Sequence, residues 1–168
     1  MAKTYEPIAT TTLGSAQNSV TFSSIPGSYT DLVLIASCRL ASAGFAATLQ
    51  FNGDTGSNYS VTELYGNGSS AGSGRNSNIA AAYQTNNLAL GATASVYSPL
   101  IINIMNYSNS TTYKTVLSRF SNANTGVDAI VNLWRSTNAI NEVKIGLTGT
   151  GGNYASGSTF TLYGIAAA

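Results

Sequence analysis

The sequence predicts an all-β protein, folded as a jelly-roll-like antiparallel β-sandwich in a single domain. Apolar and polar residues alternate with a period of two in several segments, as in strands with one buried face. These segments are rich in Thr, Val, Ile, Tyr and Phe, and turn residues separate them at short intervals. No long segment has a helical period, although the alanine-rich residues 36–47 and 79–92 could each hold a short helix. The 168 residues suit one domain over 1–168, with residues 1–4 as a candidate flexible N-terminal arm.

About ten strands are expected from this pattern. The alternation is clearest in residues 45–51 and 142–147. Pro99 is expected to split the run at 95–107 or to bend it at a sheet edge, because proline donates no ladder hydrogen bond. In chain order, the expected strands are 4–13, 19–23, 31–38, 45–51, 59–65, 79–84, 95–107, 113–120, 127–135, 142–147 and 159–165. The last of them is expected to close a sheet beside the first.

Turn and loop residues lie between these segments. Pro26-Gly27 and Asn52-Gly53-Asp54 have the composition of tight turns. Residues 66–74 and 149–157 are rich in Gly and Ser, and each is expected to be a flexible loop.

The composition excludes several classes of function. Charged residues make up 8% of the chain and the net charge is +1, so no basic patch for nucleic acid is expected. The chain has no histidine and one cysteine, Cys38, which removes the commonest metal ligand and excludes both a cysteine zinc site and an internal disulfide. No apolar run approaches the roughly 18 residues of a membrane span, and residues 1–6 lack the apolar core of a signal peptide. We therefore expect no cofactor, no membrane partner and synthesis in a cytosol.

The sequence does not indicate an enzyme. Residues 68–72 match the Gly-x-Ser-x-Gly pattern around Ser70, but without histidine this serine has no triad base. A glycosidase would need two facing carboxylates, and no spacing singles out a pair. The carboxylates are Glu6, Asp31, Asp54, Glu63, Asp128 and Glu142.

The segment 52–58 offers closely spaced oxygen donors around Asp54 that could hold Ca²⁺. It lacks the downstream bidentate glutamate of an EF-hand. A hairpin turn is therefore the preferred interpretation.

Aromatic residues are the candidate interaction residues. Tyrosine and tryptophan cover apolar surface while keeping a polar atom, which suits protein interfaces and sugar platforms as well as sandwich cores. The candidates are Tyr59, Tyr65, Tyr83, Tyr154 and Trp134. Both the core and the interface interpretation remain open from the sequence.

The low charge also bears on assembly. A chain with so few charged residues has little electrostatic protection against self-association, and all-β chains must protect their sheet edges. An assembly that buries faces and edges would resolve this, so we expect a homo-oligomer or a subunit of a larger particle.

Both ends of the chain carry distinctive motifs. At the start these are residues 1–13 (MAKTYEPIATTTL), 20–26 (VTFSSIP) and 29–32 (YTDL), and near the end they are residues 139–145 (AINEVKI) and 152–165 (GNYASGSTFTLYGI). In these motifs the chain resembles small virion structural proteins of tailed bacteriophages. These are structural motifs, and they transfer no catalytic residue.

The resemblance implies a non-enzymatic virion protein made in the host cytoplasm. It implies a capsid decoration or cement protein, with a trimer as the favoured state and the major capsid protein or other virion proteins as partners. The alternative is a tail fibre tip or adsorption knob that binds a host surface glycan, with the loops 66–74 and 149–157 as its expected site.

Overall fold

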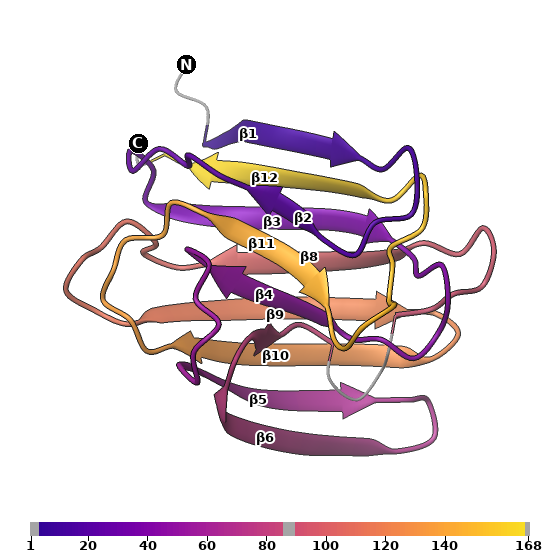
Figure 1. Cartoon of the computed structure of the whole chain (residues 1–168). Coiled ribbons are helices and arrows are strands. Elements are labelled where there is room, and N and C mark those ends of the chain that lie inside the picture. The colour runs from indigo at the N-terminus through magenta and orange to yellow at the C-terminus, as the bar shows by residue number, and fades with distance from the viewer. Residues whose placement is uncertain (1–3, 86–89, 167–168) are drawn as a thin grey trace.

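A computed structural model describes residues 4–85 and 90–166 (Figure 1). The strands are β1 (Tyr5–Thr12), β2 (Val20–Phe22), β3 (Asp31–Cys38), β4 (Ala47–Phe51), β5 (Tyr59–Gly66), β6 (Ala71–Ile79), β7 (Ala82–Tyr83), β8 (Ser98–Ile104), β9 (Lys114–Asn122), β10 (Gly126–Trp134), β11 (Val143–Leu147) and β12 (Thr159–Ile165). The described residues contain no helix, so the alanine-rich segments form none in their described parts. Apart from Thr4, the expected N-terminal arm lies outside the described residues.

The strands form two antiparallel sheets that pack face to face. The larger sheet has eight strands in the order β1-β12-β3-β8-β9-β10-β5-β6, and the smaller has four in the order β2-β11-β4-β7. In Figure 1 the smaller sheet crosses in front of the larger one. The predicted all-β sandwich in a single domain is confirmed. The jelly-roll topology stays a prediction. A jelly roll divides eight strands between two sheets, whereas the larger sheet here has eight strands by itself, including β9, β10, β5 and β6.

The core lies between the sheets and is built by alternation. In β9, for example, every inward residue is buried, and the outward residues are exposed except for the half-buried Ser121. Inward residues of both sheets, such as Leu34, Ile102, Val116, Leu49 and Ile145, are fully buried in one continuous apolar cluster. Burial of this surface is the main term that stabilises a sandwich.

The chain ends meet as predicted. β12 pairs with β1 along its whole length, from Tyr5 opposite Ile165 to Thr12 opposite Thr159. β12 also pairs with β3, so the C-terminal strand is covered on both sides. The register shifts between Pro7 and Ala9, and a proline beside a bulge protects the outer edge of β1 from pairing with another chain.

Two expectations about local structure are wrong. The predicted loop 66–74 is a short turn followed by β6, which pairs with β5 as a hairpin. The Asn67 side chain closes this turn by accepting hydrogen bonds from the backbone of Ser69 and Ser70, a local interaction that Gly-rich composition conceals. The predicted strand 79–84 is reduced to the two residues of β7.

Pro99 neither splits its strand nor lies at a sheet edge. It occupies the second position of the interior strand β8. The pairing of β8 with β9 begins only at Leu100, so the missing amide of Pro99 costs no hydrogen bond to β9.

No helix with the length and hydropathy of a membrane span occurs in residues 4–85 and 90–166.

Candidate interaction surface

Trp134 and Tyr59 lie in the core of the sandwich. The Trp134 side chain is 2% exposed and Tyr59 is fully buried. Their rings stack with centroids 6.3 Å apart, and the Phe51 ring lies 5.4 Å from that of Trp134. Burial, together with the nearby Asp54 carboxylate, raises the pKa of Tyr59 to about 12. No partner can contact these residues while the sandwich is closed. Of the two interpretations, core residue and interface residue, only the first fits Trp134 and Tyr59.

Tyr154 is also a core residue. It is fully buried, and its ring packs edge-on against Phe160 of β12 with centroids 5.0 Å apart. Its hydroxyl donates to the Gly146 carbonyl of β11 over 2.9 Å. Its backbone exchanges hydrogen bonds with Gln17. Tyr154 thus joins the two sheets, and residues 149–157 are anchored at their centre instead of forming the expected flexible loop.

The remaining two candidates keep accessible surface, but not on one face. Tyr65 is half-buried at the end of β5, with its ring over Gly72 of β6. A Cβ atom at Gly72 would lie 2.5 Å from the Tyr65 hydroxyl oxygen, so the glycine makes room for the ring. Tyr83 is half-buried on β7 of the smaller sheet. The structure therefore does not gather the five predicted aromatic residues into one surface.

Asp54 is a structural acceptor. Its carboxylate accepts hydrogen bonds from Trp134 Nε1 at 2.7 Å, from Asn58 Nδ2 at 3.0 Å and from the Gly56 amide at 2.8 Å. Partial burial opposes ionisation, but these donors outweigh it and hold the pKa of Asp54 below its ordinary value. N–H donors therefore surround the oxygens that Ca²⁺ would need. The expected hairpin turn is wrong, because β4 and β5 do not pair with each other: residues 52–58 connect the smaller sheet to the larger one. Among the described residues, no group of three or more His, Cys, Asp or Glu is placed to hold a metal ion.

The lowered pKa of Asp54 predicts acid sensitivity. The carboxyl has a lower pKa folded than unfolded, so its contribution to stability is present above its ordinary pKa of 3.8 and is lost as the pH falls through the folded pKa. We expect Asp54→Asn to lose this contribution at pH 7 and to unfold with a weaker dependence on pH below 4. Denaturant unfolding of both proteins at pH 7, 4 and 3, followed by the fluorescence of Trp134, measures it. An equal loss of stability in both proteins between pH 4 and pH 3 would contradict the assignment.

Two further carboxylates and Ser70 are placed by the strands β5 and β10 and by the turn after β5. Glu63 and Asp128 are buried on inward positions of the neighbouring strands β5 and β10, where a polysaccharide cannot reach them. Ser70 lies in the turn between β5 and β6, and its hydroxyl is hydrogen-bonded to Asn67 Oδ1.

A broad accessible surface is the outward face of the eight-stranded sheet. The smaller sheet covers only the inward face, and large apolar side chains project from the other. Leu64 on β5 is 65% exposed and Val127 on β10 is 56% exposed. Leu117, Val131 and Ile35 are exposed on β9, β10 and β3. We call these five residues and the strands between them the outer apolar face. Exposed apolar patches of this kind mark interaction sites.

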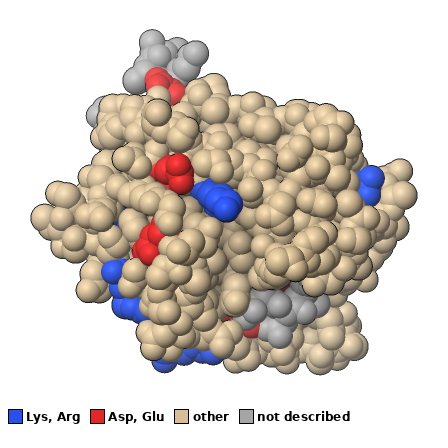
Figure 2. Space-filling model, in the orientation of Figure 1, with Lys and Arg blue, Asp and Glu red and all other residues tan. Residues whose placement is uncertain are grey.

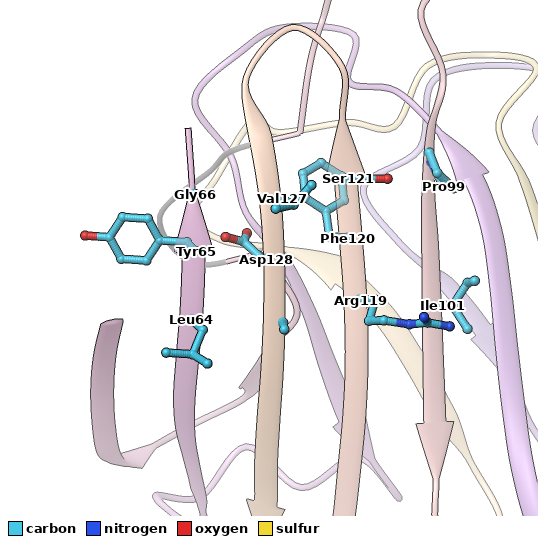
Figure 3. A pocket seen from close by; sticks show the side chains of 11 residues that line it. Leu64, Tyr65, Gly66, Pro99, Ile101, Arg119, Phe120, Ser121, Val127 and Asp128 are labelled. Carbon is cyan, nitrogen blue, oxygen red and sulfur yellow. The ribbon is translucent and has the colours of Figure 1, made fainter. Parts of the chain in front are cut away.

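Arg119 lies at the centre of the outer apolar face. The pairing register places it opposite Ala129 on one side and Ile101 on the other, and Ala129 in turn lies opposite Leu64. Figure 3 shows the Arg119 side chain laid across the strands toward Ile101. Arg119 is exposed, and within the described part of the chain no hydrogen bond or ion pair holds its guanidinium group.

Two hollows flank this arginine. One, of about 630 Å³, is lined by Arg119, Leu64, Val127 and Pro99 among others. The second, of about 460 Å³, shares Arg119, Leu64 and Ala129 with the first and continues past Leu117 and Val131. The small side chain of Ala129 between larger neighbours leaves the surface concave here. Such a surface can seat protruding side chains of a partner.

The sequence carries a signal for this face that differs from the alternation of a strand with one buried side. Segments 113–120 and 127–135 place apolar residues at both inward and outward positions, as Val116 beside Leu117 and Ile130 beside Val131 show. Apolar residues on both faces indicate a strand that is covered on both sides. In the isolated chain only one side of these strands is covered.

A smaller, polar hollow lies on the other side of the sandwich. It has a volume of about 250 Å³ and lies on the four-stranded sheet, lined by Tyr83, Gln50, Lys144, Thr48 and Asn18 among others. Figure 2 shows this side of the molecule, where charged side chains are few and scattered over a largely uncharged surface.

No protein-family model and no curated protein matches this chain in sequence.

Proposed function

We propose that this chain is a non-enzymatic structural protein of a tailed-bacteriophage virion, namely a capsid decoration protein that bridges neighbouring shell subunits. The observation that carries the proposal is the outer apolar face, a broad sheet surface with exposed Leu64, Val127, Leu117 and Val131 that suits burial against another protein. The resemblance of residues 1–13 and 152–165 to virion proteins supports the same role.

The outward side of the larger sheet is wide enough for a stable attachment. With about 4.8 Å between strands and about 3.3 Å per residue, the five strands of the outer apolar face, of about seven residues each, present roughly 550 Å², and the flanking strands β1, β12 and β6 extend the whole outward side to roughly 900 Å². A stable protein–protein interface buries about 800 Å² on each partner. The protein would then stabilise the shell by mass action, because its binding site exists only where shell subunits are assembled side by side.

We also propose that the chain assembles as a homo-oligomer, with a trimer as the favoured state. The charge content of 8% supports assembly, since isolated copies have little electrostatic protection in solution. Light scattering on the purified chain gives the number of copies directly.

The proposed location is tested by quantitative mass spectrometry of purified virions. A copy number equal to that of the major capsid protein, or a simple fraction of it, is the expected result. A few copies per particle would move the protein to the tail, and absence from the particle would contradict any virion role.

A glycan-binding tail component is the second candidate. The polar hollow on the smaller sheet favours it, since Tyr83 offers a ring for stacking and Gln50, Thr48 and Lys144 offer polar atoms around it. Binding of the isolated protein to host polysaccharide, without binding to assembled shells, would favour this role over decoration.

A further inference from the structure

We propose that the outer apolar face binds a protein surface that presents a carboxylate to Arg119, with apolar side chains seated in the hollows on either side. This inference rests on the proposed function, since it specifies the chemistry of the shell surface that a decoration protein would cover. It follows from the charge, the surroundings and the shape of the face.

The charge of the face is positive. Arg119 at its centre and Arg75 on the edge strand β6 both occupy outward positions. No acidic residue does so on β5, β8, β9 or β10, because Glu63 and Asp128 point into the sandwich. The outward carboxylate of Asp31 lies at the start of β3, two strands away, and accepts a hydrogen bond from the Asn106 amide. A complementary surface therefore carries negative charge at its centre.

The surroundings of Arg119 require the partner to supply an acceptor. Burying a guanidinium group without a hydrogen-bond partner is strongly unfavourable. Ile101 and Ala129, opposite it on the neighbouring strands, have no side-chain acceptors. Ser121 and Asn103 on the same face do have them, but no hydrogen bond joins either of these side chains, or any other described residue, to the guanidinium group. A carboxylate fits best, because it can accept two parallel hydrogen bonds from the planar guanidinium group.

A second copy docking through the same face is disfavoured by the same charges. Two outer apolar faces brought together would bury Arg119 and Arg75 of each copy with no acidic residue opposite the centre. Nucleic acid is disfavoured as well, since its binding needs many phosphate contacts and the face is mainly apolar. The face thus fits an acidic and apolar protein surface.

The test uses the full chain and purified shells assembled without it. Wild-type protein, Arg119→Glu and Arg119→Gln are titrated onto the shells, and bound protein is measured by co-sedimentation. Arg75→Glu is the matched control, because it makes the same change of charge on the same face but outside the hollows. We expect Arg119→Glu to weaken binding at least tenfold and Arg75→Glu to change it less than threefold. Binding of the wild type should weaken as NaCl rises from 50 to 500 mM, and Arg119→Gln should show a smaller dependence.

The binding results that contradict this inference differ from those that contradict the proposed function. If the wild type binds but Arg119→Glu binds equally well, the role of Arg119 is wrong and the proposed function stands. If the wild type does not bind shells, the proposed function fails and this inference falls with it. If sedimentation shows that the free chain dimerises and Leu64→Asp abolishes the dimer, the occupant is a second copy and the proposal is overturned. Equal thermal midpoints of all variants establish that folding is unchanged.

Discussion

Trp134→Ala is expected to lower the free energy of unfolding by about 3–5 kcal/mol. The substitution leaves a cavity between Phe51 and Tyr59, whose rings pack on the indole. It also removes the hydrogen bond of 2.7 Å that the indole N–H donates to the Asp54 carboxylate. Because the sandwich is closed at this point by side chains from both sheets, the surroundings can collapse only partly. Chemical denaturation followed by circular dichroism is the suitable measurement, since Trp134 is the only tryptophan and its fluorescence is lost in the variant.

Trp134→Phe separates the two contributions. It keeps most of the packing and removes only the indole N–H, so we expect an intermediate loss of stability that includes about 1.5–3 kcal/mol for the lost hydrogen bond to the Asp54 carboxylate, which keeps its donors Asn58 and Gly56. A loss of less than 1 kcal/mol in Trp134→Ala would mean that this aromatic cluster contributes little to the fold.

Tyr154→Ala is expected to destabilise the protein by a similar amount, about 3–5 kcal/mol. Tyr154 packs on Phe160 of the larger sheet and bonds to Gly146 of the smaller one, so its removal weakens the contact between the sheets. Urea unfolding followed by Trp134 fluorescence reports the change, because Trp134 lies in a different part of the core.

Tyr154→Phe is the matched control for the hydroxyl group. It keeps the ring and leaves the Gly146 carbonyl without its donor, for an expected loss of about 1–2 kcal/mol. If Tyr154→Ala unfolded like the wild type, the role of Tyr154 in joining the sheets would be refuted.

Much of the fold could be predicted because period-two alternation is a local property. Segments 45–51, 142–147 and 159–165 alternate clearly, and β4, β11 and β12 lie there. The pairing of β12 with β1 was also predicted. The hairpin of β5 and β6 was missed because β6 consists of Gly, Ser, Asn and one Arg between a terminal Ala and a terminal Ile, with little apolar alternation to reveal it. Its pairing with β5 supplies the order that its own composition does not indicate.

The candidate site was predicted less well. Tyr59, Tyr154 and Trp134 attract attention in a sequence because they are large and amphipathic, yet all three are buried. Arg119 and Ala129 have no local pattern that singles them out. They meet only because β9 and β10 pair in the register that places them opposite each other.

The sequence by itself determined that this chain is an antiparallel β-sandwich with few charges, because alternation and composition depend only on neighbouring residues. The tertiary structure alone decided which aromatic residues face the core and which face of the larger sheet stays open. Both depend on which strands pair and on what covers each face. Leu64 and Leu162 illustrate the difference: both are leucines in alternating strands, but Leu162 faces the second sheet and is buried, whereas Leu64 faces away from it and is 65% exposed.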